Sequence, residues 1–231
     1  MPLDNKIAVA ISLFVFGLVV LFLLWPGRRQ GERLLRRWGI ADPGEQDIAD
    51  GVRYLRRRRF WYPWLFLLIP GVIPTILGPI LVGGLLAEVF AQRPARQARR
   101  SALLVERRVL DLVPWWAIIL FALASLGAAV RLGLTSQWVL LTAVVVTAAA
   151  AWVVVLLAVR RPAIGRAEVD LALRTRSARV AVGLAIAAVA SLGASPIGNL
   201  PGFLAAVLGV VALIAISQPD RHRAPAALRA G

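Results

Sequence analysis

Several apolar runs, each close to the length of a membrane-spanning helix, alternate along this chain with clusters of arginine. About 20 apolar residues are needed to cross the hydrocarbon core of a bilayer. The chain is 59% hydrophobic with a mean hydropathy of +0.75, more apolar than a typical soluble domain. We therefore expect an all-α, polytopic helical membrane protein with about seven membrane segments: one anchor helix and three helical hairpins, joined by cytoplasmic amphipathic helices.

The run Phe60–Gln92 determines the predicted topology, because arginines flank both of its ends. Basic residues beside membrane spans stay on the cytoplasmic side, so the run must enter and leave the bilayer on the same side. Prolines interrupt it, and we expect a turn near Gly71–Pro74. Each limb would be roughly 21–26 Å long, shorter than the ~30 Å hydrocarbon core, so the hairpin is either two short tilted spans or a wedge. The alternative is one long span, which would place Arg93 and the arginines after it outside.

The same charge rule divides the whole chain. The predicted segments are an N-terminal anchor helix at 1–26, with its span at Ile7–Leu24 and its N-terminus outside; a cytoplasmic arginine-rich segment at 27–59; the short proline-rich hairpin at 60–92; a cytoplasmic helix and second hairpin at 93–159; a cytoplasmic helix and third hairpin at 160–217; and a cytoplasmic tail at 218–231, expected to be disordered. Of the 27 basic residues, only Lys6 and Arg131 lie outside the segments predicted to be cytoplasmic. Lys6 is the only lysine, and such arginine-rich composition is typical of high-GC bacteria. The predicted location is therefore a bacterial plasma (inner) membrane.

Two short helices are predicted before the first hairpin. Arg28–Trp38 forms the first, with Leu34, Leu35 and Trp38 on one side, and Gly39 ends it. Asp42 is expected to cap the second, because Pro43 suits the first helical position and Glu45 stands three residues after the cap.

The second hairpin is predicted from the apolar runs Val113–Arg131 and Gln137–Val159, and the third from Val180–Ala194 and Leu200–Ser217. An internal repeat accompanies them. Its matches are Ala-Ser-Leu-Gly-Ala at Ala124–Ala128 and Ala190–Ala194, and Arg-Pro-Ala at Arg93–Ala95 and Arg161–Ala163. Small residues let helix backbones approach closely in membranes. Such residues recur at a spacing of four in two of the limbs, at Gly183, Ala187 and Ser191 and at Ala143, Thr147 and Ala151. We expect these faces to pack within the bundle rather than to form a homodimer.

Residues suited to catalysis are scarce. The chain has no cysteine, and His222 is its sole histidine. No glycine-rich phosphate loop with lysine is present. We therefore predict no catalytic, cofactor-binding or metal-binding residues, no cofactor and no enzymatic activity.

Glu88 is the one acidic residue within an apolar run. Ionisable residues inside membranes are functional candidates by default, as proton or ion sites. Glu88 also lies near the cytoplasmic end of its limb, so it could instead reach the interface or pair with Arg93. We favour the structural interpretation and keep an intramembrane functional acid as the alternative.

The net charge of +15 points to a polyanionic partner. Arginines at membrane edges contact anionic lipid head groups, and no nucleic-acid-binding fold accompanies them, so we expect the lipid bilayer rather than nucleic acid. Other membrane proteins are possible partners. The candidate lipid or partner contacts are Arg56, Arg57, Arg58, Arg59, Arg99, Arg100, Arg107 and Arg108. The leading hypothesis is a non-enzymatic scaffold or partner- and lipid-binding membrane protein. A small permease or transporter subunit is the alternative, and a lipid-modifying enzyme is third.

Overall fold

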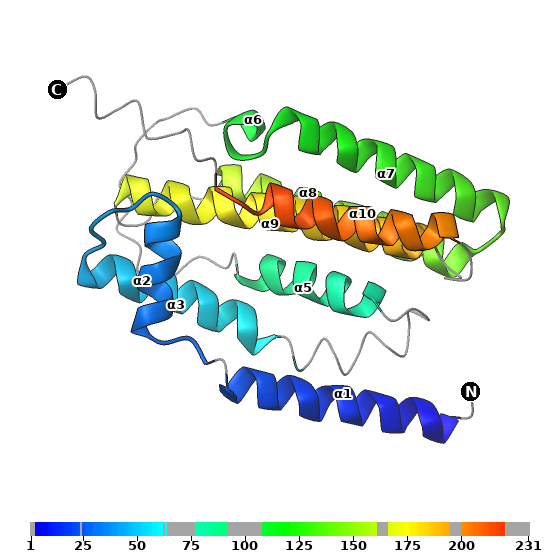
Figure 1. Cartoon of the computed structure of the whole chain (residues 1–231), viewed down its shortest axis with the longest axis horizontal. Helices are drawn as coiled ribbons and strands as arrows, with labels where there is room; N and C mark the ends of the chain where they lie inside the picture. The colour runs from blue at the N-terminus through cyan, green and yellow to red at the C-terminus, as the bar shows by residue number, and fades with distance from the viewer. Residues whose placement is uncertain are drawn as a thin grey trace.

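The computed structural model describes residues 3–23, 25–61, 63, 77–91, 108–160, 166–194 and 200–219, and within them it contains helices and no strand. The helices are α1 (Leu3–Leu23), α2 (Arg28–Arg37), α3 (Glu45–Phe60), α5 (Leu77–Ala91), α6 (Val109–Leu112), α7 (Trp115–Leu134), α8 (Trp138–Arg160), α9 (Ala167–Gly193) and α10 (Leu200–Ile216). Most of the long helices run along one common direction, while α2 crosses that direction at one end of the molecule (Figure 1). We call this end, which holds α2, α6 and the start of α9, the arginine-rich end.

Three of the described helices, α7, α8 and α9, are long and apolar enough to cross a membrane. The apolar helix α10 has 17 residues and α5 has 15, so both are shorter. The predicted all-helical membrane fold is therefore confirmed at this level. The count of seven segments and their arrangement as three hairpins stay predictions. The turn expected near Gly71–Pro74 lies outside the described residues.

Helix α9 is the centre of the bundle. In its most apolar stretch 83% of the residues are buried, against 22% in α7 and 33% in α8. It packs against α5, α7, α8 and α10. The outward faces of α7, α8 and α10 instead expose large apolar side chains, which in lipid is a favourable arrangement. The most exposed of them are Leu134, Leu200, Leu208, Trp115, Trp138, Leu126, Leu123 and Val139.

The expected cytoplasmic helix and the first limb of the third hairpin form one continuous helix, α9. In its first half the polar residues Asp170, Arg174, Ser177 and Arg179 are buried, and the two arginines bind carbonyls of neighbouring helices. Arg174 donates from Nη1 to the carbonyl of Ala158 near the end of α8, at 3.0 Å. Arg179 donates from Nε to the carbonyl of Leu112 at 3.2 Å and from Nη1 to that of Gln218 at 3.0 Å. These carbonyls follow or end α6 and α10, so α9 caps three helices whose last carbonyls lack intrahelical partners.

The end of α2 has the predicted glycine. Gly39 has φ +92°, a conformation that favours glycine. The backbone N–H of Gly39 donates to the carbonyl of Arg36, and that of Ile40 donates to Leu35, both at 3.1 Å. This pair of bonds is the Schellman motif, and the buried side chains of Ile40 and Leu35 supply its apolar contact.

The start of α3 differs from the prediction. The helix begins at Glu45 with Gly44 as its N-cap, so the expected Asp42 cap is wrong. The side chain that stabilises this helix start is Asp47, inside the helix: its Oδ2 accepts a hydrogen bond from the backbone N–H of the N-cap residue Gly44 at 3.0 Å. Arg166, just before α9, lies 3.0 Å from the same oxygen. This contact with a distant arginine was not visible in the local pattern.

Helices α2 and α3 cross at glycine. A Cβ on Gly31 would lie 2.7 Å from Cγ2 of Val52 and 2.9 Å from the carbonyl oxygen of Ile48. A Cβ on Gly51 would lie 3.5 Å from the carbonyl oxygen of Gly31. The absence of a side chain at Gly31 therefore sets how closely α2 sits on α3.

Candidate functional site

Three helices meet around the carboxylate of Glu88. Glu88 lies in the last turn of α5, Ser177 lies in the first half of α9, and α3 supplies Tyr54 and Arg58. Tyr54 and Arg58 are four residues apart, which places them on the same face of α3. Both side chains therefore reach Glu88 from one helix while Ser177 approaches from another.

Both carboxylate oxygens of Glu88 are in contact with these partners. Oε2 accepts hydrogen bonds from the hydroxyls of Tyr54, at 2.7 Å, and Ser177, at 2.9 Å. Oε1 lies 2.7 Å from Nε of Arg58 in an ion pair. Glu88 is fully buried, and the side chain of Arg58 is only 16% exposed. The sequence suggested that Glu88 could reach the interface or pair with Arg93. Glu88 is fully buried and pairs with Arg58, and Arg93 lies outside the described residues.

Tyr54 remains a proton donor in this cluster. Burial raises the pKa of its hydroxyl well above the ordinary value, because the phenolate would lose its hydration. The guanidinium of Arg176 lies 5.1 Å from the centre of the Tyr54 ring and opposes this rise in the pKa. The neighbouring carboxylate of Glu88 adds to the rise, since two adjacent negative charges repel.

This arrangement joins helices. A buried carboxylate is stable only when charge and hydrogen-bond partners compensate for its lost hydration. Glu88 finds its partners on α3 and α9, so one side chain ties α5 to both. Asp170 and Arg174 form a second buried pair within α9, with Nε 2.6 Å from Oδ2. In the described parts of the chain, no three histidine, cysteine or acidic side chains gather where they could hold a metal ion.

The predicted arginine contacts of α3 separate into different environments. Arg58 faces Glu88. Arg56 turns back toward the end of α1: its Nε donates to the carbonyl of Pro26 at 3.2 Å, and its guanidinium lies 5.6 Å from the centre of the Trp25 ring. Arg57 and Arg59 are half-buried, and Arg108 is exposed. Arg99, Arg100 and Arg107 lie outside the described residues, as does His222.

A basic face on α2 was missed as a candidate. Arg29, Arg33 and Arg37 are all exposed and recur at a spacing of four, so they share one side of the helix. The opposite side packs Gly31 and Leu35 into the protein. Among the described residues these three arginines have no acidic partner. Their spacing of four, on the side of the helix away from Leu35, was the signal in the sequence that could have identified the face.

The chain matches no protein-family model, no curated protein and no solved structure. Its own residues and their geometry are therefore the guide to its function.

Proposed function

We propose that this chain is a non-enzymatic integral membrane protein that binds the anionic head groups of cytoplasmic-leaflet phospholipids through the basic face of α2. The observation that carries the proposal is the row Arg29, Arg33 and Arg37, exposed on one side of a short helix and without acidic partners in the described chain. Each basic residue near an anionic membrane surface contributes about 1 kcal/mol of attraction. Three on one face form a surface that suits phosphate groups.

The position of α2 supports a membrane-surface role. Helix α1 ends at Leu23 and α2 begins at Arg28, and five residue steps reach at most about 18 Å. If α1 crosses the bilayer as predicted, α2 starts at the level of the head groups. The crossing at Gly31 and the contact of Arg56 with Pro26 support α2 and its connection to α1. The arginine row is then presented by a fixed helix.

A matched pair of triple variants tests the proposal. Arg29, Arg33 and Arg37 replaced together by Gln should lower the retention of phosphatidylglycerol over phosphatidylcholine, measured by native mass spectrometry from mixed-lipid nanodiscs. Replacement of Arg28, Arg36 and Arg53 by Gln removes the same charge from arginines that pair with Glu45, Glu32 and Asp50. This control should have a clearly smaller effect. Equal effects of the two triples, with correct insertion of both, would contradict a specific role for the α2 face.

The permease alternative has less support. A coupled permease needs an ionisable group that the substrate path can reach, and Glu88 was its candidate. Glu88 is fully buried, with contacts from Tyr54, Ser177 and Arg58. These contacts favour a joint between helices over a site that exchanges protons or ions.

A further inference from the structure

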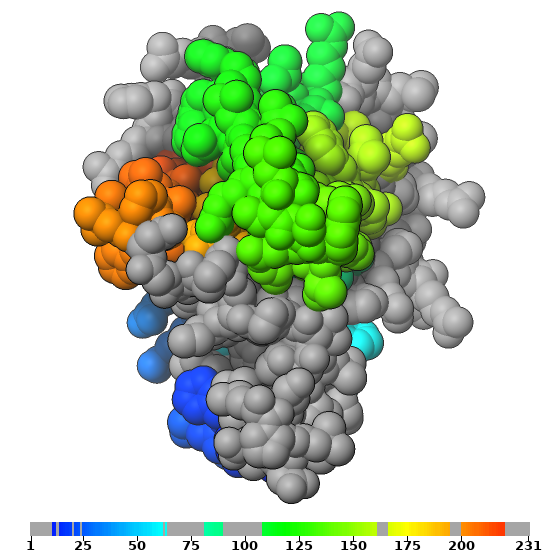
Figure 2. Space-filling view, turned by 90° about the vertical axis from the view of Figure 1, so that its right-hand side faces the viewer, coloured from blue at the N-terminus to red at the C-terminus, as the bar shows by residue number. Residues whose placement is uncertain are grey.

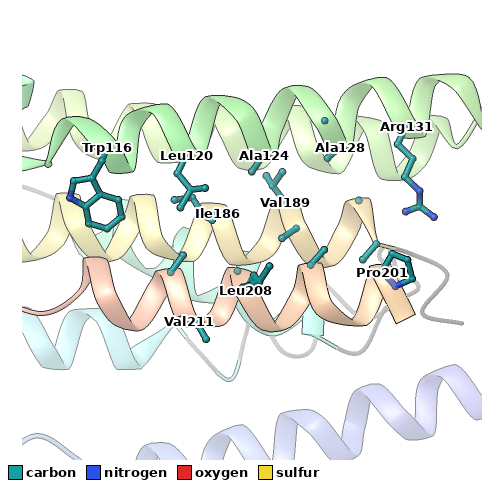
Figure 3. A pocket seen from close by; sticks show the side chains of 18 residues that line it. Trp116, Leu120, Ala124, Ala128, Arg131, Ile186, Val189, Pro201, Leu208 and Val211 are labelled. Carbon is teal, nitrogen blue, oxygen red and sulfur yellow. The ribbon is translucent and has the colours of Figure 1, made fainter. Parts of the chain in front are cut away.

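An open groove runs along the bundle between α7 and α10, with α9 between them (Figure 3). Its volume is about 600 Å³, and apart from Arg131 its lining is almost wholly apolar. Trp116 lies near one end of the groove and Arg131 near the other (Figure 3). Figure 2 views the molecule from the end that carries the α7–α8 turn and shows α7 beside α10 on this side.

Small residues create the groove. Both copies of Ala-Ser-Leu-Gly-Ala contribute to its lining, Ala124, Gly127 and Ala128 from α7 and Ala190, Gly193 and Ala194 from α9. Gly193 is in contact with Ala128, so the two helices meet there. Gly127 has no neighbour within 4 Å of the position of a Cβ and opens on the groove. The space therefore results from side chains that are short on the facing surfaces.

Arg131 places a positive charge at the far end of this apolar space. It is half-buried, three residues before the end of α7, and has no acidic partner among the described residues. Figure 3 shows its side chain pointing from α7 past the groove on the side of Pro201. A charge at the edge of a membrane span is stabilised by an anionic partner at the interface. Guanidinium and phosphate form strong paired hydrogen bonds.

We propose that the groove binds an anionic phospholipid of the outer leaflet, with one acyl chain along α7, α9 and α10 and the phosphate at Arg131. The 15 residue steps from Trp116 to Arg131 cover about 22 Å of helix, more than the roughly 15 Å of hydrocarbon in one leaflet. An acyl chain therefore fits lengthwise. The length of the groove and the charge of Arg131 together favour an anionic lipid over another helix.

This site is separate from the basic face of α2. Its proposed phosphate contact, Arg131, lies at the end opposite the arginine-rich end, and none of the groove residues belongs to α2. Loss of lipid at one site therefore leaves the other measurable, and each proposal can fail without the other.

Native mass spectrometry and photo-crosslinking test the groove. The probes are phosphatidylglycerol and phosphatidylcholine with identical chains, and a phosphatidylglycerol with a photoactivatable acyl chain. Wild-type protein should retain phosphatidylglycerol preferentially, and crosslinks should map to α7 and α10. Arg131→Gln should lower that preference about fivefold, the factor that corresponds to one juxtamembrane arginine. Gly127→Leu, which fills the open position, should remove the acyl-chain crosslinks of the photoactivatable phosphatidylglycerol. Leu126→Ile, at a side chain that is 63% exposed away from the groove, is the matched control and should change nothing.

Three outcomes would overturn the proposal. One is that the photoactivatable lipid crosslinks to α7 and α10 of the Gly127→Leu variant as strongly as to those of the wild type. Another is an unchanged lipid preference in Arg131→Gln. The third is a wild-type dimer whose mass falls to that of a monomer in Gly127→Leu, since the groove would then hold a second copy of the chain.

Discussion

Gly193 on α9 lies directly against Ala128 on α7: a Cβ on Gly193 would be 2.8 Å from the Cβ of Ala128 and 3.2 Å from its Cα. The two residues belong to the two copies of the same pentapeptide. Segments 66 positions apart in the sequence therefore meet side by side in the bundle. The glycine of one copy closes this contact, while the corresponding glycine of the other, Gly127, faces open space.

This asymmetry predicts different effects for two identical substitutions. Gly193→Leu should lower the thermal stability of the delipidated protein in detergent, because overpacking a close contact costs about 1–3 kcal/mol. Gly127→Leu should leave the stability nearly unchanged, since no atom lies within 4 Å of the added Cβ. Melting of both variants at the same temperature would show that the contact between Gly193 and Ala128 is not maintained in detergent.

Replacement of Glu88 tests the joint between α3, α5 and α9. Glu88→Ala should destabilise the protein by about 3–5 kcal/mol, because it removes the acid from a buried ion pair. Glu88→Gln should have a smaller effect, since an amide keeps the size and part of the hydrogen bonding. Glu45→Gln is the control: Glu45 pairs with Arg28 at the exposed surface, where a salt bridge contributes about 0–1 kcal/mol. Equal unfolding midpoints for Glu88→Ala and Glu45→Gln would exclude the structural role of Glu88.

The raised pKa of the buried Tyr54 hydroxyl predicts a loss of stability at alkaline pH. Its pKa is raised in the folded protein, so the folded state holds the hydroxyl proton more tightly than the unfolded state does. The contribution of the protonated Tyr54 hydroxyl to the free energy of unfolding is fully present below the unfolded tyrosine pKa of about 10. It is lost as the pH rises above that value. Unfolding temperatures should therefore fall from about pH 9 to 11 in the wild type and less steeply in Tyr54→Phe. Tyr62→Phe is the control, because Tyr62 is the only other tyrosine. A wild-type slope in Tyr54→Phe would contradict the prediction.

The crossing of α2 and α3 predicts opposite outcomes for two glycines. Gly31→Ala should loosen α2, because the added methyl would lie 2.7 Å from Val52 and 2.9 Å from the backbone of Ile48. Gly51→Ala meets ordinary contacts at 3.5 Å or more and should be neutral or stabilising, since alanine favours a helix by up to about 1 kcal/mol over glycine. Hydrogen exchange of the α2 amides measures the difference. Slow exchange in both variants would mean that Gly31 does not set the contact.

Cysteine labelling tests the predicted orientation. The chain has no cysteine, so single additions have no background. Ser136→Cys, in the turn between α7 and α8, should react with an impermeant thiol reagent in intact cells. Ala49→Cys, exposed on α3 at the arginine-rich end, should react only after lysis. The reverse pattern would invert the topology and place the α2 face outside.

Much of the helical framework was predictable from local sequence. The apolar runs at 137–159 and 200–217 became α8 and α10 with ends shifted by only a residue or so, and Gly39 ended α2 as expected. The start of α3 was missed because the capping side chain is Asp47 inside the helix, which binds the backbone N–H of Gly44 and also the distant Arg166, rather than Asp42 before it. The spacing of four indicated the basic face of α2 in the sequence. The face was recognised only once the structure showed which side of the helix is buried.

The sequence by itself determined that helices form and that several of them are long and apolar enough to cross a membrane, because the hydrogen bonds of a helix and the hydropathy of a run are properties of a local segment. It did not determine which charged residues turn inward. Arg58 faces Glu88 and Arg179 caps two other helices, although their neighbours in sequence are also arginines or apolar residues. Those roles, and the contact of Gly193 with Ala128, depend on which helix faces pack together. That choice joins residues 30 to 67 positions apart, so only the tertiary structure decided it.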